Sequence, residues 1–83
     1  MSELDATMTS LTQREREVLA LLAKGMTNRE IAREMEVGEQ WIKLLVSRIL
    51  MKLEVPNRAA AAHLYIVHPY IVHPYIRSQR NQE

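Results

Sequence analysis

Residues 11–58 read LTQREREVLALLAKGMTNREIAREMEVGEQWIKLLVSRILMKLEVPNR, and one helix-start signal occurs in them twice. Thr12 is followed three residues later by Glu15, and Thr27 is followed in the same way by Glu30. Such a threonine hydroxyl can cap the free N–H groups of a helix while the glutamate side chain reaches back to the threonine N–H, an arrangement called a capping box. The repeated signal predicts two helices that begin immediately after Thr12 and Thr27.

Both predicted helices are short and carry apolar residues at helical spacing. Gly25 can supply the left-handed residue that ends the first helix, and the second helix spans about two turns. The residues expected to face the core are Val18, Leu19 and Leu22 in the first helix and Ile31, Ala32 and Met35 in the second.

The next helix is longer and has two unlike faces. Residues 36–38 form a break of the length found between the two helices of a helix-turn-helix, and Gly38 is expected to take a backbone angle that a side chain would resist. Gly38 is also a weak N-cap, so the third helix is predicted over residues 39–53. A core-facing stripe is predicted for Ile42, Val46, Ile49 and Leu53, flanked by Leu45 and Leu50. The opposite face mixes donors and apolar groups, which suits base edges in a DNA major groove, and carries Gln40, Lys43, Leu44, Ser47, Arg48 and Met51.

A fourth helix is predicted over residues 58–67, because Asn57 is a good N-cap and Pro69 ends the helical pattern. The pentapeptide YIVHP at 65–69 is repeated at 70–74. We expect residues 68–83 to form an irregular apolar tail that adds to a homodimer contact, and residues 1–10 to form a flexible segment. The predicted fold class is therefore all-α, a four-helix helix-turn-helix domain over residues 11–67 with that C-terminal tail.

The composition excludes several kinds of site. The 83 residues include no cysteine and carry a net charge of +1, so thiolate chemistry is excluded and a cytoplasmic protein is favoured. His63, His68 and His73 recur every five residues, but they share no helical face and have no acidic ligand among them, so neither a metal nor another cofactor is predicted. An enzyme is not expected, because the serines lack a neighbouring histidine and carboxylate and the two glycines form no phosphate-binding loop. The apolar residues 65–76 are too few to span a membrane.

Four separated motifs agree in order and spacing with one known family. They are LTQREREVL (11–19), GMTNREIA (25–32), WIK (41–43) and ILMKLEVPNR (49–58). Together these residues resemble the LuxR/FixJ (GerE-type) DNA-binding domain of bacterial transcription regulators over about residues 10–67. The resemblance implies a four-helix domain whose third helix enters the major groove and whose fourth helix pairs two protomers.

The resemblance also implies roles for particular side chains. Lys43, Leu44 and Ser47 occupy positions from which the family reads bases, and Asn28 and Lys52 match its phosphate contacts. The chemistry of the base-reading positions agrees, because Lys43 can donate to guanine, Leu44 can cover a thymine methyl group and Ser47 can donate or accept.

Further contacts are predicted from general chemistry and from the fourth helix. Thr27 begins a helix whose free N–H groups suit a phosphate, and Arg48 attracts phosphates whatever the base sequence. The predicted dimer interface consists of Ala59, Ala62, Tyr65 and Ile66. We therefore expect a dimeric regulator that binds paired half-sites of double-stranded DNA about one helical turn apart.

Two alternatives stay open. Trp41 and Leu45 are apolar where the LuxR/FixJ pattern has threonine and histidine, so the third helix could instead bind a protein, for instance a full-length regulator that it blocks. A domain resembling region four of sigma factors shares the Arg-Glu-Val-Leu and Glu-Ile-Ala patterns, although the ending from Lys52 to Arg58 favours the LuxR/FixJ type.

Overall fold

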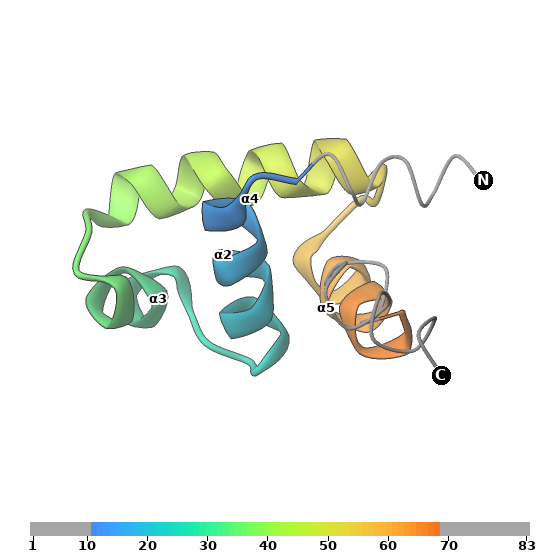
Figure 1. Ribbon diagram of the computed structural model, residues 1–83, viewed down its shortest axis with the longest axis horizontal. Helices are drawn as coiled ribbons and strands as arrows, with labels where there is room; N and C mark the ends of the chain where they lie inside the picture. Colours follow the sequence, from blue (N-terminus) through green and yellow to red (C-terminus); the bar gives the residue numbers. More distant parts are fainter. Residues whose placement is uncertain (1–10, 69–83) are drawn as a thin grey trace, which may run out of the picture.

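The computed structural model describes residues 11–68, and the four predicted helices are present in it (Figure 1). They are α2 (Gln13–Ala23), α3 (Asn28–Met35), α4 (Glu39–Leu53) and α5 (Arg58–Val67). Figure 1 shows α4 lying across α2, with α3 and α5 on either side of α2. The all-α prediction is confirmed for the described residues. The predicted N-terminal segment and residues 69–83 of the predicted tail lie outside them, whereas α5 ends at Val67 as predicted.

Side-chain caps explain where the helices begin. The Thr12 hydroxyl accepts a hydrogen bond of 3.1 Å from the Glu15 N–H, and the Thr12 N–H donates to Glu15 Oε1 at 2.8 Å. Thr27 and Glu30 form the same pair of bonds at the start of α3. Asn57 caps α5 through its side-chain oxygen. Both predicted capping boxes are therefore confirmed.

The break between α3 and α4 differs from the prediction. Gly38 has φ −74° and ψ 147°, an ordinary extended conformation, whereas Glu36 has φ 59° and ψ 47° in the left-handed region. The expectation of an unusual backbone angle at Gly38 is wrong, because the left-handed residue has to follow the last helical residue directly. The N–H of Glu36 donates to the carbonyl oxygens of Ala32 and Arg33, and the N–H of Val37 donates to the carbonyl oxygen of Ala32. These bonds end α3. Gly38 is the N-cap of α4, as predicted, and makes no side-chain hydrogen bond.

The core contains residues from all four helices. Its buried apolar residues are Leu11, Val18, Leu19, Leu22, Ile31, Ala32, Ile42, Leu45, Val46, Ile49, Leu53 and Ala61. The stripe predicted on α4 is confirmed, since its four residues are buried and Leu50 packs against them. One side of α4 is thereby fixed to the rest of the domain, which orients the other side. None of the helices within residues 11–68 has both the length and the apolar character needed to cross a membrane.

Candidate nucleic-acid interface

The side of α4 that faces away from the core forms a continuous exposed band. Because successive helical residues turn by about 100°, the residues opposite the buried stripe fall together. We call this band the α4 outer face, and it consists of Gln40, Lys43, Leu44, Ser47, Arg48 and Met51, all of them exposed. Leu44 is 47% exposed and Met51 is 75% exposed. Hydrogen-bond donors and apolar side chains are thus presented on one rigid surface.

Lys43 is held only weakly within the domain. Its Nζ lies 4.0 Å from Glu39 Oε2, one helical turn away, and both side chains are about half exposed. An exposed pair at this spacing contributes about 0.3–0.5 kcal/mol to stability. Lys43 can therefore exchange Glu39 for an acceptor on a ligand at little cost.

The start of α3 carries Thr27 and Asn28, two of the residues predicted to bind phosphate. Thr27 uses its oxygen as the helix cap, which leaves the hydroxyl hydrogen as a donor. The Asn28 Oδ1 atom accepts a hydrogen bond of 2.8 Å from Arg58 Nη1. Within residues 11–68, the backbone N–H groups of Asn28 and Arg29 have no acceptor, as is usual for the first turn of a helix. These N–H groups stand at the positive end of the helix dipole, where an anion is favoured.

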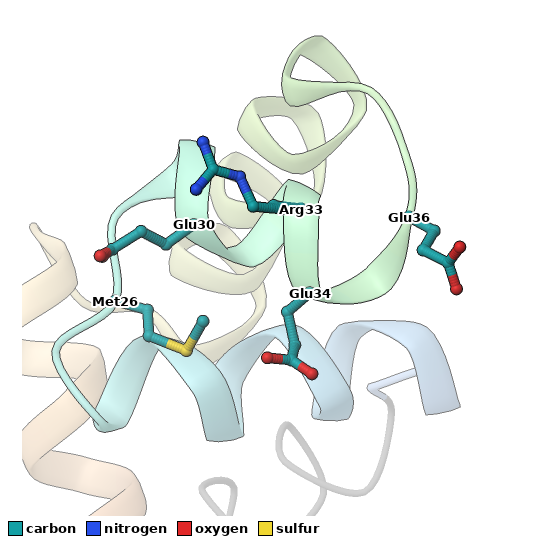
Figure 2. Close-up of a pocket in the computed structure, with 5 residues that line it drawn as sticks. All are labelled: Met26, Glu30, Arg33, Glu34 and Glu36. Atoms are coloured by element: carbon teal, nitrogen blue, oxygen red, sulfur yellow. The ribbon is translucent and has the colours of Figure 1, made fainter.

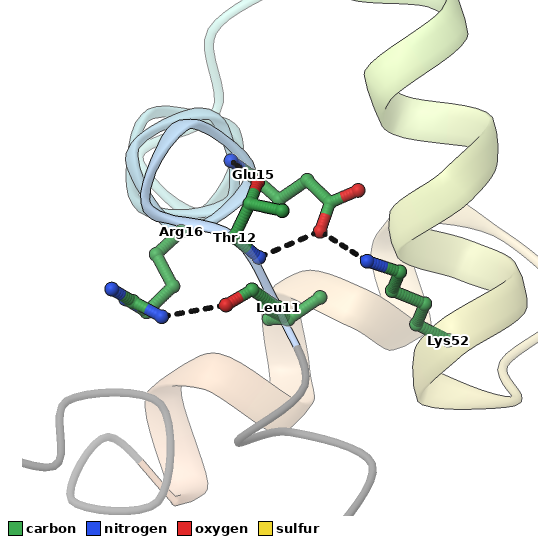
Figure 3. Close-up of polar contacts among 5 residues, drawn as sticks. All are labelled: Leu11, Thr12, Glu15, Arg16 and Lys52. Atoms are coloured by element: carbon green, nitrogen blue, oxygen red, sulfur yellow. Dashed lines mark hydrogen bonds and ion pairs between the residues drawn. The ribbon is translucent and has the colours of Figure 1, made fainter.

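Lys52 forms an ion pair that connects α4 with α2. Its Nζ is 2.7 Å from Glu15 Oε1, the same oxygen that accepts the Thr12 N–H (Figure 3). Glu15 is buried, and one third of the Lys52 side chain is exposed. Burial raises the pKa of the Glu15 carboxyl, but the hydrogen bonds from Lys52 and Thr12 outweigh it, and the pKa is lowered overall. Lys52 therefore joins the last turn of α4 to the start of α2 through a charged carboxylate.

Acidic side chains gather elsewhere, on α3. A hollow of about 550 Å³ is lined by Met26, Glu30, Arg33, Glu34 and Glu36 (Figure 2). Three carboxylates against one guanidinium make this surface unfavourable for phosphate groups. They do not form a metal site either, since no three His, Asp or Glu side chains among the described residues are arranged to hold an ion. The electrostatics favour the α4 outer face over this hollow as a surface for nucleic acid.

The residues predicted to pair two protomers lie in two different environments on α5. Ala59 and Ile66 are exposed, with Ile66 at 63%. Ala62 and Tyr65 are half-buried, because they pack against the core of the domain. The exposed part of α5 that could meet a second copy therefore centres on Ala59 and Ile66.

The two apolar residues that depart from the family pattern are drawn into the domain. Leu45 is 4% exposed and belongs to the core, as its place beside the buried stripe predicts. Trp41 is half-buried and packs against the same core. The exposed apolar side chains of α4 are consequently Leu44 and Met51. If the helix binds a protein, these two residues rather than Trp41 and Leu45 would form the contact surface.

Two contacts have no counterpart in the sequence predictions. The first is the buried pair between Glu15 and Lys52, and nothing in a capping box distinguishes a buried glutamate from an exposed one. The second is Arg58, which donates to Asn28 and also, through Nη2, to the Met26 carbonyl at 2.9 Å. The position of Arg58 in the sequence does carry a signal. A cation in the first turn of a helix is unfavourable to the helix dipole, so an arginine there indicates a compensating contact.

Comparison with known proteins identifies one family. The family described as bacterial regulatory proteins, luxR family, matches residues 9–65 of the chain. This match includes all of α2, α3 and α4 and most of α5.

Individual relatives are similar over the same part of the chain. The chain is 45% identical to the transcriptional regulatory protein LiaR of Bacillus subtilis over 53 residues, which are 64% of this chain and 25% of LiaR. It is 43% identical to the transcriptional regulatory protein DesR of the same organism over 61 residues, 74% of this chain and 31% of DesR. It is 44% identical to the DNA-binding transcriptional activator DevR/DosR of Mycobacterium tuberculosis over 55 residues, 66% of this chain and 25% of that protein. The chain thus matches between a quarter and a third of the length of these relatives.

Proposed function

We propose, since this chain belongs to the luxR family of bacterial regulatory proteins, that it binds double-stranded DNA as a dimer and regulates transcription. Members of this family are regulators and not enzymes, in agreement with the sequence prediction. The observation that carries the proposal is the α4 outer face, where Lys43, Ser47 and Arg48 are exposed on a helix whose other side is fixed in the core. A rigid helix with donors on its exposed side is what reading a major groove requires. Because the partner would be chromosomal DNA, the proposed location is the cytoplasm.

In the proposed complex, three residues of the α4 outer face contact bases. Lys43 donates to guanine O6 or N7, Ser47 bonds to a base edge, and Leu44 covers a thymine methyl group. The near-half exposure of Leu44 supports this role, because an apolar side chain gains by covering another apolar group.

Four other residues are proposed to contact phosphates. Thr27 and Asn28 would do so from the start of α3, together with free backbone N–H groups. Arg48 would do so from α4, and Lys52 from the last turn of the same helix. These contacts supply affinity and register rather than sequence preference.

The proposed dimer forms through α5, with Ala59 and Ile66 at its centre and Ala62 and Tyr65 beside them. Small alanine side chains permit close approach of two helices, and the exposed Ile66 supplies apolar area. Two copies related by a two-fold axis would place two α4 helices on half-sites one helical turn apart.

The proposal is tested by fluorescence anisotropy of the full chain on labelled duplex DNA at increasing salt concentration. We expect the logarithm of the binding constant to fall linearly with the logarithm of salt concentration, with a slope of about −2 to −4 per protomer for two to four neutralised phosphates. Selection from a random duplex pool then supplies the preferred site. An absence of binding at low salt, together with an empty selection, would overturn the proposal.

The role of Leu44 has a separate test, in which each thymine of the selected site is replaced in turn by deoxyuridine. Loss of one contacted methyl group is expected to weaken binding of the wild type about fourfold, from ~0.8 kcal/mol per buried carbon. The variant Leu44→Ala should bind the thymine site about as weakly and should be insensitive to deoxyuridine. Met51→Ala is the matched control, since Met51 is exposed on the same face, and it should remain sensitive. Equal sensitivity in all three proteins would remove Leu44 from the base contacts.

The second candidate is a protein-binding module of the same fold. The exposed Leu44 and Met51 are the observation that favours it, because two large apolar side chains lie two turns apart on one surface. If the protein fails to bind DNA but forms a complex with a regulator that carries the same domain, the protein-binding function is supported.

A further inference from the structure

We infer that Arg58 is a positioning residue for DNA binding, which holds the Asn28 side chain so that its amide NH₂ group is presented to a phosphate. This inference rests on the proposed function and adds to it a residue that touches no DNA. The Arg58 guanidinium lies at the first position of α5, whereas Asn28 is the first residue of α3. The contact therefore joins two helix starts that are far apart in the sequence.

The donors and acceptors at this contact fix the orientation of the Asn28 amide. Arg58 Nη1 is 2.8 Å from Asn28 Oδ1, and Arg58 Nη2 is 2.9 Å from the carbonyl oxygen of Met26. A guanidinium has donors only. The atom of the Asn28 amide that faces it must therefore be the oxygen, and the amide cannot turn over without losing the bond. What remains for a ligand is the Nδ2 group, a donor.

The second bond gives the contact its rigidity. Because the guanidinium is planar, its two N–H directions are fixed relative to each other, so one side chain holds both the residue at the start of α3 and the backbone just before it. Arg58 and Asn28 are both half-buried, which limits alternative rotamers. A donor held in place in advance loses less conformational entropy when it binds.

The residues around the Asn28 amide favour binding of an anion next to it. Asn28 and Arg58 line a hollow of about 380 Å³ together with Thr27, Arg29 and Glu39. The Arg29 guanidinium, the threonine hydroxyl and the first N–H groups of α3 outweigh the one carboxylate, because Glu39 has Lys43 4.0 Å away. The hollow therefore favours a negatively charged oxygen near the Asn28 amide.

The test is a double-mutant cycle in duplex binding, with Asn28→Ala, Arg58→Met and the double variant measured at one salt concentration. Each single change should weaken binding roughly fivefold, the size expected for one hydrogen bond. If Arg58 acts through Asn28, the double variant should also lose roughly fivefold, whereas independent contacts would multiply to roughly 25-fold. A product of the two single losses would overturn the inference.

The salt dependence separates positioning from direct contact. Arg58→Met should leave the slope of log K against log salt unchanged, because Arg58 would neutralise no phosphate. If the guanidinium itself bound a phosphate, the slope would become smaller by about 0.9. Arg58→Lys keeps the charge but not the planar fork, and we expect it to bind as weakly as Arg58→Met.

Two further variants guard against a purely structural explanation. Asn28→Asp keeps an acceptor for Arg58 and so should leave the thermal unfolding midpoint unchanged or raised, yet it replaces the outward donor by a carboxylate oxygen and should weaken binding more than Asn28→Ala. Val18→Ala removes part of a buried core side chain of α2 and should lower the midpoint without a change in affinity at a temperature where the protein is folded. A wild type that binds no duplex would overturn the proposed function and this inference together, whereas a wild type that binds while Asn28→Ala has no effect would overturn this inference alone.

Discussion

Replacing Lys52 by methionine is expected to lower the free energy of unfolding by about 2 kcal/mol, because the Glu15 carboxylate would lose its charged partner while staying buried. The removal of one partner of a fully buried pair costs about 3–5 kcal/mol, and the one-third exposure of the Lys52 side chain reduces this figure. For a domain of this size, about 2 kcal/mol is a large part of the total stability and lowers the unfolding midpoint by about 10 °C. Urea and thermal unfolding monitored by circular dichroism would measure both values.

The matched control is Lys24→Met, which removes the same charge from an exposed lysine at the end of α2. This control should change stability by less than about 0.5 kcal/mol. The double variant Glu15→Gln with Lys52→Met should recover part of the loss, because glutamine can still accept the Thr12 N–H without burying a charge. Equal stability of the Lys52 and Lys24 variants would show that the ion pair contributes nothing to folding.

The same pair predicts a dependence on pH. The pKa of Glu15 is lower in the folded protein than in the unfolded chain, so the unfolded chain takes up the proton first as the pH falls. The stabilisation is therefore complete above the ordinary glutamate pKa of about 4.3 and is lost as the pH falls through the lower pKa of the folded state. The difference in stability between the wild type and Lys52→Met should accordingly shrink below pH ~4. A difference that stays constant down to acid unfolding would contradict this assignment.

The helices could be predicted because their signals are local. The capping boxes at Thr12 and Thr27 involve residues three positions apart, and the stripe of α4 repeats every turn, so each signal is contained in one short segment. The exposed side of α4 follows from the same periodicity. The proposed contacts of its side chains with bases and phosphates depend on a partner and stay predictions.

The contacts that escaped prediction depend on how the helices pack. Lys52 and Glu15 are 37 positions apart, and Arg58 and Asn28 are 30 positions apart. No periodicity within one helix brings such residues together, because their distance is set by the crossing of two helices over a shared core. The error at Gly38 has a related cause, since the residue that takes the left-handed conformation is determined by where the hydrogen bonds of α3 end.

The simultaneous replacement of Lys43 and Arg48 by glutamate is expected to weaken DNA binding on the order of 100-fold or more. Loss of the proposed Lys43 base contact alone would cost about 1–3 kcal/mol, and Arg48 would lose its proposed phosphate contact. Each new carboxylate would in addition repel the duplex. Both side chains are exposed, so the thermal unfolding midpoint should move by less than about 4 °C. Anisotropy on the selected duplex, with circular dichroism on the same samples, would measure the two effects separately.

The matched control for this pair is Arg14→Glu with Arg33→Glu, which changes the net charge by the same amount on α2 and α3. Both arginines are exposed, and Arg33 lies at the acidic hollow of α3 rather than on α4. If DNA binds at the α4 outer face, the control should lose far less affinity than the Lys43 and Arg48 variant, because screening by salt limits charge effects to about 10 Å. Equal losses would mean that net charge alone drives binding. Full affinity in the Lys43 and Arg48 variant would move the DNA-binding surface off α4, and the exposed Leu44 and Met51 would then point to a protein partner.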